Sequence, residues 1–283
     1  MSIKINGFPV EEVTFPNGEV SFKFPHHILN SARGFQDVFK VEVNISNSSD
    51  LVRFLLFQDM LRENTSTYDQ CHLEFPFFPY SRADRRFKDM PFSLKTFCNM
   101  INMDFWDTVT TYDVHNPVPI EEYLGIKFEN SMFKSAKACS AIFMGHVVDH
   151  STVCVVAPDA GSYERAVDFY ECMKDTSELA GYNVNFKSLI FDKVRDESSG
   201  KILDIKPADR VPEADLYILV DDICDAGGTF LGVADHLPKD KKKILFVTHG
   251  YFSKGTQLLT DAFDAVYTSS TVYKGNNEKV FVV

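Results

Sequence analysis

The stretch LYILVDDICDAGGT, residues 216–229, decides the fold because an acidic glycine turn follows a buried apolar segment. Its first five residues are apolar and include Val and Ile, which is too short a run for a helix and typical of a buried strand. After the turn, apolar residues recur at the spacing of one helix face: Phe230, Val233, Ala234 and Leu237. The sequence therefore predicts the strand, turn and helix of an α/β protein.

The acidic turn itself indicates what it holds. A helix start leaves backbone N–H groups without partners, and these groups favour an anion such as phosphate. Asp221 and Asp222 are not phosphate ligands, and their natural partners are hydroxyl groups or a magnesium shell. The turn has neither the Walker nor the dinucleotide glycine spacing. It is interpreted as the holder of a sugar phosphate, with a plain strand-to-helix turn as the alternative.

Composition limits the class of protein. The chain has 283 residues, 45% of them apolar, a length that favours two domains. A net charge of −11 argues against a nucleic-acid surface. The cations gather instead in small clusters, as an anionic small molecule requires, although a solvated charged face is the commoner explanation for any one of them: 82–88, 193–195 and 239–243. Six scattered cysteines without a C-x-x-C pair predict neither zinc nor a disulfide framework.

The sequence also carries no membrane signal. Its first twelve residues lack an apolar leader segment, and no apolar run approaches the roughly 18 residues of a membrane helix. We therefore expect a soluble protein of a reducing compartment, the cytoplasm, with no membrane partner.

Strands alternate with helical segments along both halves of the chain. Strands are expected at 39–45, 71–75, 108–112, 153–157, 186–191, 216–220, 244–248 and 280–283. This order predicts two domains, 1–148 and 149–283, each a mainly parallel sheet covered by helices on both faces. The last strand is expected in the second domain or packed back on the first.

Chemically active side chains follow two of these strands, at the sheet edge where α/β proteins bind ligands. Asp113 and His115 follow the strand 108–112, and on an extended chain both side chains face the same way. That geometry suits one divalent cation, and a structural histidine is the alternative. Asp159, after Pro158, is either a turn-former or helix cap, or a magnesium ligand.

Lys193 and Arg195 follow the strand 186–191 and precede residues 196–200, DESSG, which have no apolar anchors. We expect this segment to be mobile. The pair is interpreted either as part of a solvated loop or as a lid that brings two cations onto a transferring phosphoryl group.

The turn 221–229 resembles the phosphoribosyl-diphosphate binding motif of the type I phosphoribosyltransferase fold. Further segments, in this order and across nearly the whole chain, resemble the ribose-phosphate diphosphokinases: FPNGE (15–19), PYSRADRRF (79–87), YDVHNP (112–117), APDAGSYERA (157–166), DKVR (192–195) and VTHGYFS (247–253). The resemblance implies two stacked phosphoribosyltransferase-like domains, ATP on the first and ribose 5-phosphate on the second, with the active site between them. One departure is Ala83, where the family usually has Gln.

The resemblance also implies an activity, which is transfer of the β,γ-diphosphoryl group of ATP to the anomeric hydroxyl of ribose 5-phosphate, with Mg²⁺ as cofactor. The implied ATP-binding residues are Phe15, Asn17, Glu19, Arg82, Asp84 and Arg85. The implied ribose 5-phosphate residues are Asp221, Asp222, Asp225, Ala226, Gly227, Gly228 and Thr229. The implied metal-binding residues are Asp113, His115 and Asp159.

Lys193 and Arg195 are implied to be catalytic, stabilising the transition state. In the family, the segment matching 15–19 reaches the adenine of a neighbouring subunit, which implies a homo-oligomer, at least a dimer. Two alternatives stay open: a phosphoribosyltransferase that consumes phosphoribosyl diphosphate (PRPP), and a non-catalytic homologue that regulates a synthase.

Overall fold

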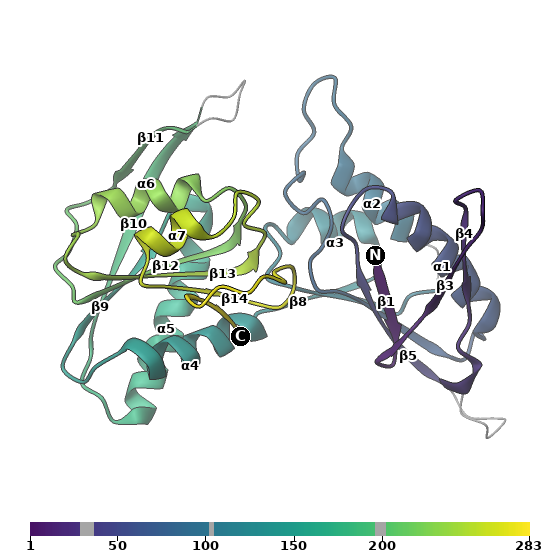
Figure 1. Cartoon of the computed structure of the whole chain (residues 1–283), viewed down its shortest axis with the longest axis horizontal. Helices are drawn as coiled ribbons and strands as arrows, with labels where there is room; N and C mark the ends of the chain where they lie inside the picture. Colours follow the sequence, from purple (N-terminus) through teal and green to yellow (C-terminus); the bar gives the residue numbers. More distant parts are fainter. Residues whose placement is uncertain (29–36, 102–104, 196–201) are drawn as a thin grey trace. The chain divides into compact units, whose positions relative to one another are not determined.

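The computed structural model describes residues 1–28, 37–101, 105–195 and 202–283 (Figure 1). The chain divides into two compact units, Met1–Ser131 and Met132–Val283. Among the described residues, no helix is long and apolar enough to cross a membrane.

Unit 1 contains a six-stranded sheet in the order β2-β1-β5-β6-β7-β8. Its strands are β1 (Ser2–Ile5), β2 (Phe8–Pro9), β5 (Val38–Asn44), β6 (Gln70–Phe75), β7 (Thr108–Tyr112) and β8 (Lys127–Ser131). β5 to β8 are parallel, whereas β1 is antiparallel to both of its neighbours. Its helices are α1 (Asp50–Asn64), α2 (Ser93–Ile101) and α3 (Val118–Leu124), and η1 (His26–Ile28) is a short 3₁₀ turn. A separate hairpin consists of β3 (Glu11–Thr14) and β4 (Val20–Lys23).

The helices of unit 1 cover one face of its sheet. Residues that alternate along the strands, such as Phe39, Val41 and Leu73, share one core with apolar residues of α1, α2 and α3. Lys40 and Glu42 lie between them and are exposed or half-buried. β5 to β8 follow one another in a single direction, so right-handed crossovers put every connecting helix on the same side. The predicted coverage of both faces is therefore wrong for the described part of unit 1.

Unit 2 contains a seven-stranded sheet in the order β11-β10-β9-β12-β13-β14-β15. Its strands are β9 (Thr152–Ala157), β10 (Asn185–Arg195), β11 (Ile202–Pro207), β12 (Leu216–Cys224), β13 (Lys242–Gly250), β14 (Ala265–Thr268) and β15 (Val280–Val282). All neighbours are parallel except β10 and β11. Its helices are α4 (Phe133–His146), α5 (Tyr163–Ala180), α6 (Gly228–His236) and α7 (Gln257–Ala262).

Helices cover both faces of this second sheet (Figure 1). Residues such as Val155 and Ile218 pack with α4 and α5, whereas Val156 and Leu219 face the core that holds α6. The chain runs from β9 outward to β10 and then returns to β12 on the other side of β9. This reversal places α6 on the face opposite to α5, since each crossover is right-handed. The strands are buried on both sides, which explains their continuous apolar sequence.

The boundary between the units differs from the expected one at 148/149. Ala138, Ile142 and Phe143 of α4 lie in one core with residues of β9 and β12. α4 therefore belongs to unit 2, and the division falls after Ser131. The last strand, β15, pairs with β14 in the sheet of unit 2.

Candidate functional site

The carboxyl ends of β9 and β12 mark the point where the strand order of unit 2 reverses. Such a switch point is where open α/β sheets bind ligands, because the connecting helices leave in opposite directions. Asp159 follows β9, Asp221 and Asp222 lie near the end of β12, and Lys193 lies near the end of β10. The sheet thus brings four of the sequence-predicted residues to one edge.

Asp159 uses its two carboxylate oxygens for different purposes. Oδ1 accepts hydrogen bonds from the backbone N–H groups of Gly161 at 3.0 Å and Ser162 at 3.2 Å. This caps the 3₁₀ turn η2 (Ala160–Ser162), as the helix-cap interpretation predicted. Oδ2 forms an ion pair with Nζ of Lys193, whose side chain is only 10% exposed. The carboxylate that is a candidate metal ligand therefore holds the candidate catalytic lysine.

The segment DKVR belongs to β10 and pairs with β11, with a register irregularity at Val194 and Arg195. Sequence reasoning did not find β11. The side chain of Arg195 and residues 196–200, where a mobile lid is predicted, lie outside the described part of the chain.

The paired acids of β12 differ in their surroundings. Asp222 is only 3% exposed, and its N–H donates to Oδ1 of Asp221 at 2.9 Å. Burial, and next the charge of Asp222, raise the pKa of Asp221 well above its ordinary value, and Arg165 opposes this shift. Nη1 of Arg165 lies 3.7 Å from Oδ1 of Asp221. The raised pKa of Asp221 means that two adjacent carboxylates are unfavourable in this buried place, which favours binding of hydroxyl groups or a cation beside them.

Sequence reasoning missed Arg165. It lies in the first turn of α5, and its side chain is 10% exposed. The available signal was a cation in the first helical turn after a strand-end Asp, in the segment 157–166. Because the turn after β9 and the end of β12 share one sheet edge, that arginine reaches the acids of the neighbouring strand.

The predicted phosphate turn is an open loop at the start of α6. Gly227 has a φ of 82°, and a Cβ there would lie 3.2 Å from Leu259, so the position requires glycine. No side chain caps the helix. Backbone N–H groups of Tyr251 and Phe252 donate to the Cys224 carbonyl at 2.9 and 3.1 Å, which fixes the turn to the segment 247–253. The first-turn amides of α6 are thus oriented for an anion.

At the corresponding edge of unit 1, the predicted site residues do not gather in one place. β7 ends at Tyr112, and Asp113 has a left-handed φ of 43°. Asp113 is buried, whereas His115 is exposed. The expectation that both side chains face one way is wrong, because it required an extended backbone that ends before Asp113.

Two segments of unit 1 that are predicted to bind ATP nevertheless meet. Asn116 donates through Nδ2 to Oδ2 of Asp84 at 3.0 Å, which joins the segment 79–87 to 112–117. Arg82 and Arg85 are exposed on the same segment, and Nε of Arg85 lies 4.0 Å from Asp84. Two cations are therefore available to solvent-borne phosphate here.

The third predicted ATP segment is the tip of the β3–β4 hairpin. Phe15 and Glu19 close the tip through a backbone hydrogen bond of 2.8 Å, and the Asn17 side chain donates to Glu19 at 2.8 Å. Phe15 is 47% exposed. The tip thus presents an aromatic ring beside polar groups.

The predicted metal ligands do not form a ready-made cage. Asp113 and His115 belong to unit 1 and Asp159 to unit 2. Among the described residues, no group of three His, Cys, Asp or Glu side chains is placed to hold a metal ion. Mg²⁺ is usually bound by one or two carboxylates together with substrate phosphates, so oxygen donors such as Asp159 fit it without such a cage.

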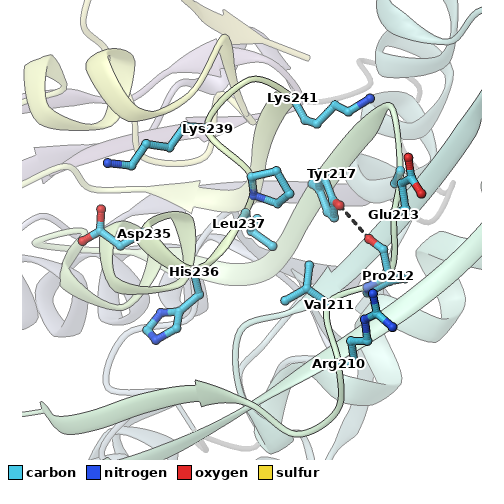
Figure 2. A pocket seen from close by; sticks show the side chains of 12 residues that line it. Arg210, Val211, Pro212, Glu213, Tyr217, Asp235, His236, Leu237, Lys239 and Lys241 are labelled. Atoms are coloured by element: carbon cyan, nitrogen blue, oxygen red, sulfur yellow. Dashed lines mark hydrogen bonds between the residues drawn. The ribbon is translucent and has the colours of Figure 1, made fainter.

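A cavity of about 680 Å³ in unit 2 lies away from these residues (Figure 2). It is lined by the segment that enters β12 and by the end of α6, with the exposed cations Arg210 and Lys239 at its margin. It contains none of the predicted site residues. Strand beginnings and strand ends lie at opposite edges of a parallel sheet, so the cavity and the candidate site are separate.

Comparisons with known proteins agree with this fold. No protein-family model matches the chain. The crystal structure of phosphoribosylpyrophosphate synthetase from Mycobacterium smegmatis superimposes with a TM-score of 0.73 and 20% identity, covering 97% of this chain and 85% of that one. The protein is thus an α/β protein of two mainly parallel sheets with the fold of that synthetase, and the predicted fold class is confirmed.

Curated sequences identify the relatives. The chain is 27% identical over 267 residues to the ribose-phosphate pyrophosphokinase of Pyrococcus abyssi, a match that covers 93% of this chain and 84% of that protein. It is 29% identical over 267 residues to that of Pyrococcus furiosus, covering 93% and 86%. The chain is a distant homologue of the ribose-phosphate pyrophosphokinase family, also called PRPP synthases, and the resemblance drawn from its motifs is confirmed.

Proposed function

We propose that this protein is a ribose-phosphate diphosphokinase that transfers the β,γ-diphosphoryl group of ATP to the anomeric hydroxyl of ribose 5-phosphate, giving PRPP and AMP. One observation carries the proposal. Lys193 lies at the same sheet edge as the acidic turn 221–229 and pairs with Asp159. A transferase that merely consumes PRPP needs a sugar-phosphate turn but no lysine for a transferring phosphoryl group.

In the proposed reaction the sugar is held by the turn. The 5-phosphate accepts hydrogen bonds from the amides of Gly227, Gly228 and Thr229 at the start of α6, where the helix dipole favours an anion. Asp221 and Asp222 accept hydrogen bonds from the ribose hydroxyls. Asp225 and Ala226 are exposed on the turn and line its outer side.

The transfer itself needs no protein nucleophile. The anomeric oxygen attacks the β-phosphorus, the bond between the α- and β-phosphates breaks, AMP leaves and the hydroxyl proton is released. Lys193 exchanges its ion pair with Asp159 for one with the transferring group, and Arg195 adds a second positive charge. These cations stabilise the charge that develops on the phosphoryl oxygens in the transition state.

Mg²⁺ supplies charge neutralisation of the polyphosphate when bound. Asp159 becomes available to the metal once Lys193 turns to the phosphates, and the exposed His115 is the proposed ligand from unit 1. We assign ATP to unit 1, through the hairpin tip 15–19 and the segment 79–87, and ribose 5-phosphate to unit 2. A cytoplasmic homo-oligomer, at least a dimer, completes the proposal.

The test is an assay of the purified protein with ATP, Mg²⁺ and ribose 5-phosphate, following AMP and PRPP. Equal amounts of both products support the proposal. A folded protein that yields neither, and that shows no heat of binding with ribose 5-phosphate, contradicts it. PRPP consumption in the presence of a nucleobase, without ATP dependence, would instead identify a phosphoribosyltransferase.

A further inference from the structure

Two thiols meet between α4 and α5, away from the candidate site. Cys139 of α4 is fully buried, and Cys172 of α5 is half-buried. Both belong to the core that joins these helices to the sheet of unit 2. Sγ of Cys139 lies beside the side chain of Thr176, one turn after Cys172 on the same helix, so the two cysteines are neighbours across α4 and α5. The structure thus places two free thiols next to each other across two helices.

A threonine hydroxyl holds this pair in position. Thr176, one turn after Cys172, donates through Oγ1 to the Cys172 carbonyl at 2.7 Å. The same oxygen lies 3.7 Å from Sγ of Cys139. Thr176 therefore links the backbone beside one thiol to the sulfur of the other, and the contact depends on a fixed geometry.

The two thiols differ in acidity. The neighbouring Cys139 thiol lowers the pKa of Cys172 to about 7, although burial and the nearby charge of Asp175 oppose this shift. The neighbouring Cys172 thiol, and next burial, raise the pKa of Cys139. Burial alone raises the pKa of Cys98 to about 12, and it is the largest cause of the same shift at Cys71, Cys154 and Cys224. Cys172 thus has the thiolate character of a reactive cysteine, and Cys139 adjoins it as a resolving thiol.

We propose that Cys139 and Cys172 are a peroxide-reactive pair that closes into a reversible disulfide between α4 and α5. The Cys172 thiolate attacks one oxygen of hydrogen peroxide, the O–O bond breaks, and Cys172 becomes a sulfenic acid as hydroxide takes up a proton to give water. The Cys139 sulfur then attacks the Cys172 sulfur, the S–O bond breaks and a second water leaves. The two thiols lose two electrons and two protons, and the peroxide is reduced to two waters.

The test treats the full-length protein with hydrogen peroxide, blocks remaining thiols with iodoacetamide and measures the intact mass and the peptides. We expect a mass lower by two hydrogen atoms before alkylation, two of the six thiols protected, and one cross-linked peptide pair containing Cys139 and Cys172. A dithiol reductant restores both thiols. C172S and C139S each abolish the cross-link, and C139S leaves a Cys172 sulfenic acid that dimedone traps.

The control is C98S, which removes a buried thiol of unit 1 and leaves the cross-link intact. A second measurement uses only the wild-type protein, so it does not depend on how variants fold. Iodoacetamide at neutral pH should label Cys172 at least about ten-fold faster than any of the buried cysteines. Over-oxidation of Cys172 without a cross-link, a disulfide between other cysteines, or equal labelling rates would each overturn the proposal.

Discussion

Both sheets consist mainly of parallel strands joined by helices, but the order of the strands differs between them. In unit 1, β5 to β8 run outward in sequence, and in unit 2 the chain reverses between β10 and β12. The reversal puts helices on both faces of the second sheet and opens a switch point at the ends of β9 and β12. In the described part of unit 1, the parallel strands have no such reversal. Strand order thus decides which of the two sheets has a switch point between parallel strands.

The polar residues at the strand ends also differ between the two units. In unit 2, Asp159 contacts Lys193, and Asp221 contacts Arg165, so charges meet directly at the edge. In unit 1, Asp113 is buried and His115 is exposed, and the cations of 79–87 face solvent. We therefore expect substitutions at the edge of unit 2 to have larger effects than those at the edge of unit 1.

The largest effect is expected for Lys193→Ala. Loss of the ammonium removes charge stabilisation of the transition state, so kcat should fall roughly a hundred- to a thousand-fold. The Kd for ribose 5-phosphate should be nearly unchanged, as measured by calorimetry. The matched control is Lys187→Ala, a lysine on the same strand that donates to the Glu213 carbonyl. An unchanged kcat for Lys193→Ala would show that this edge does not carry the transfer.

The second largest effect is expected for Asp222→Asn. The change keeps the shape of a nearly buried side chain but removes the charge that accepts hydrogen bonds from the sugar, a loss of about 1.5 to 3 kcal/mol. Ribose 5-phosphate affinity, measured by calorimetry, should fall by a factor of roughly ten to a hundred. The exposed Asp240→Asn serves as control. Equal affinity in both variants would remove Asp222 from the sugar site.

His115→Ala tests the edge of unit 1. An exposed imidazole contributes little by itself, so the Mg²⁺ concentration for half-maximal activity should rise only a few-fold, about 1 kcal/mol. A Mg²⁺ titration at fixed ATP measures this, with the exposed His150→Ala as control. A loss as large as that of Lys193→Ala would reverse the ranking of the two edges.

The smallest effect concerns stability. Burial, and next the charge of Asp222, raise the pKa of Asp221 above its ordinary 3.8, so the folded state holds that proton more tightly than the unfolded state. The contribution of this group to stability is full below pH 3.8 and is lost as pH rises through the folded-state pKa. Asp221→Asn avoids this loss and should be more stable than the wild type at neutral pH, on the order of 1 kcal/mol.

Urea denaturation at neutral pH and near pH 4 checks this prediction, because the difference between variant and wild type should shrink as Asp221 becomes protonated in both states. A variant less stable than the wild type at neutral pH would mean that the ion pair with Arg165 outweighs the burial of the carboxyl.

Most of the secondary structure was readable from the sequence. Apolar and polar residues alternate along 39–45, which predicted β5 because burial of one sheet face imposes that pattern. The continuous apolar runs at 153–157 and 216–220 predicted β9 and β12, because these strands are buried on both faces. The same alternation in unit 1 already indicated a sheet with one covered face, which the prediction of two covered faces overlooked. β11 was missed because Ile202 to Pro207 follow an acidic segment interpreted as a loop.

The sequence by itself determined the strand, the glycine turn and the helix at 216–236, because hydrophobic spacing and the turn preference of glycine act through neighbouring residues. Motifs spread along the chain also indicated its distant homology to the ribose-phosphate pyrophosphokinases. Tertiary structure alone decided that Asp159 holds Lys193, that Arg165 balances Asp221 and that Cys139 meets Cys172. These partners come from different strands and helices, and their contacts follow from strand order and helix packing, which no local pattern encodes.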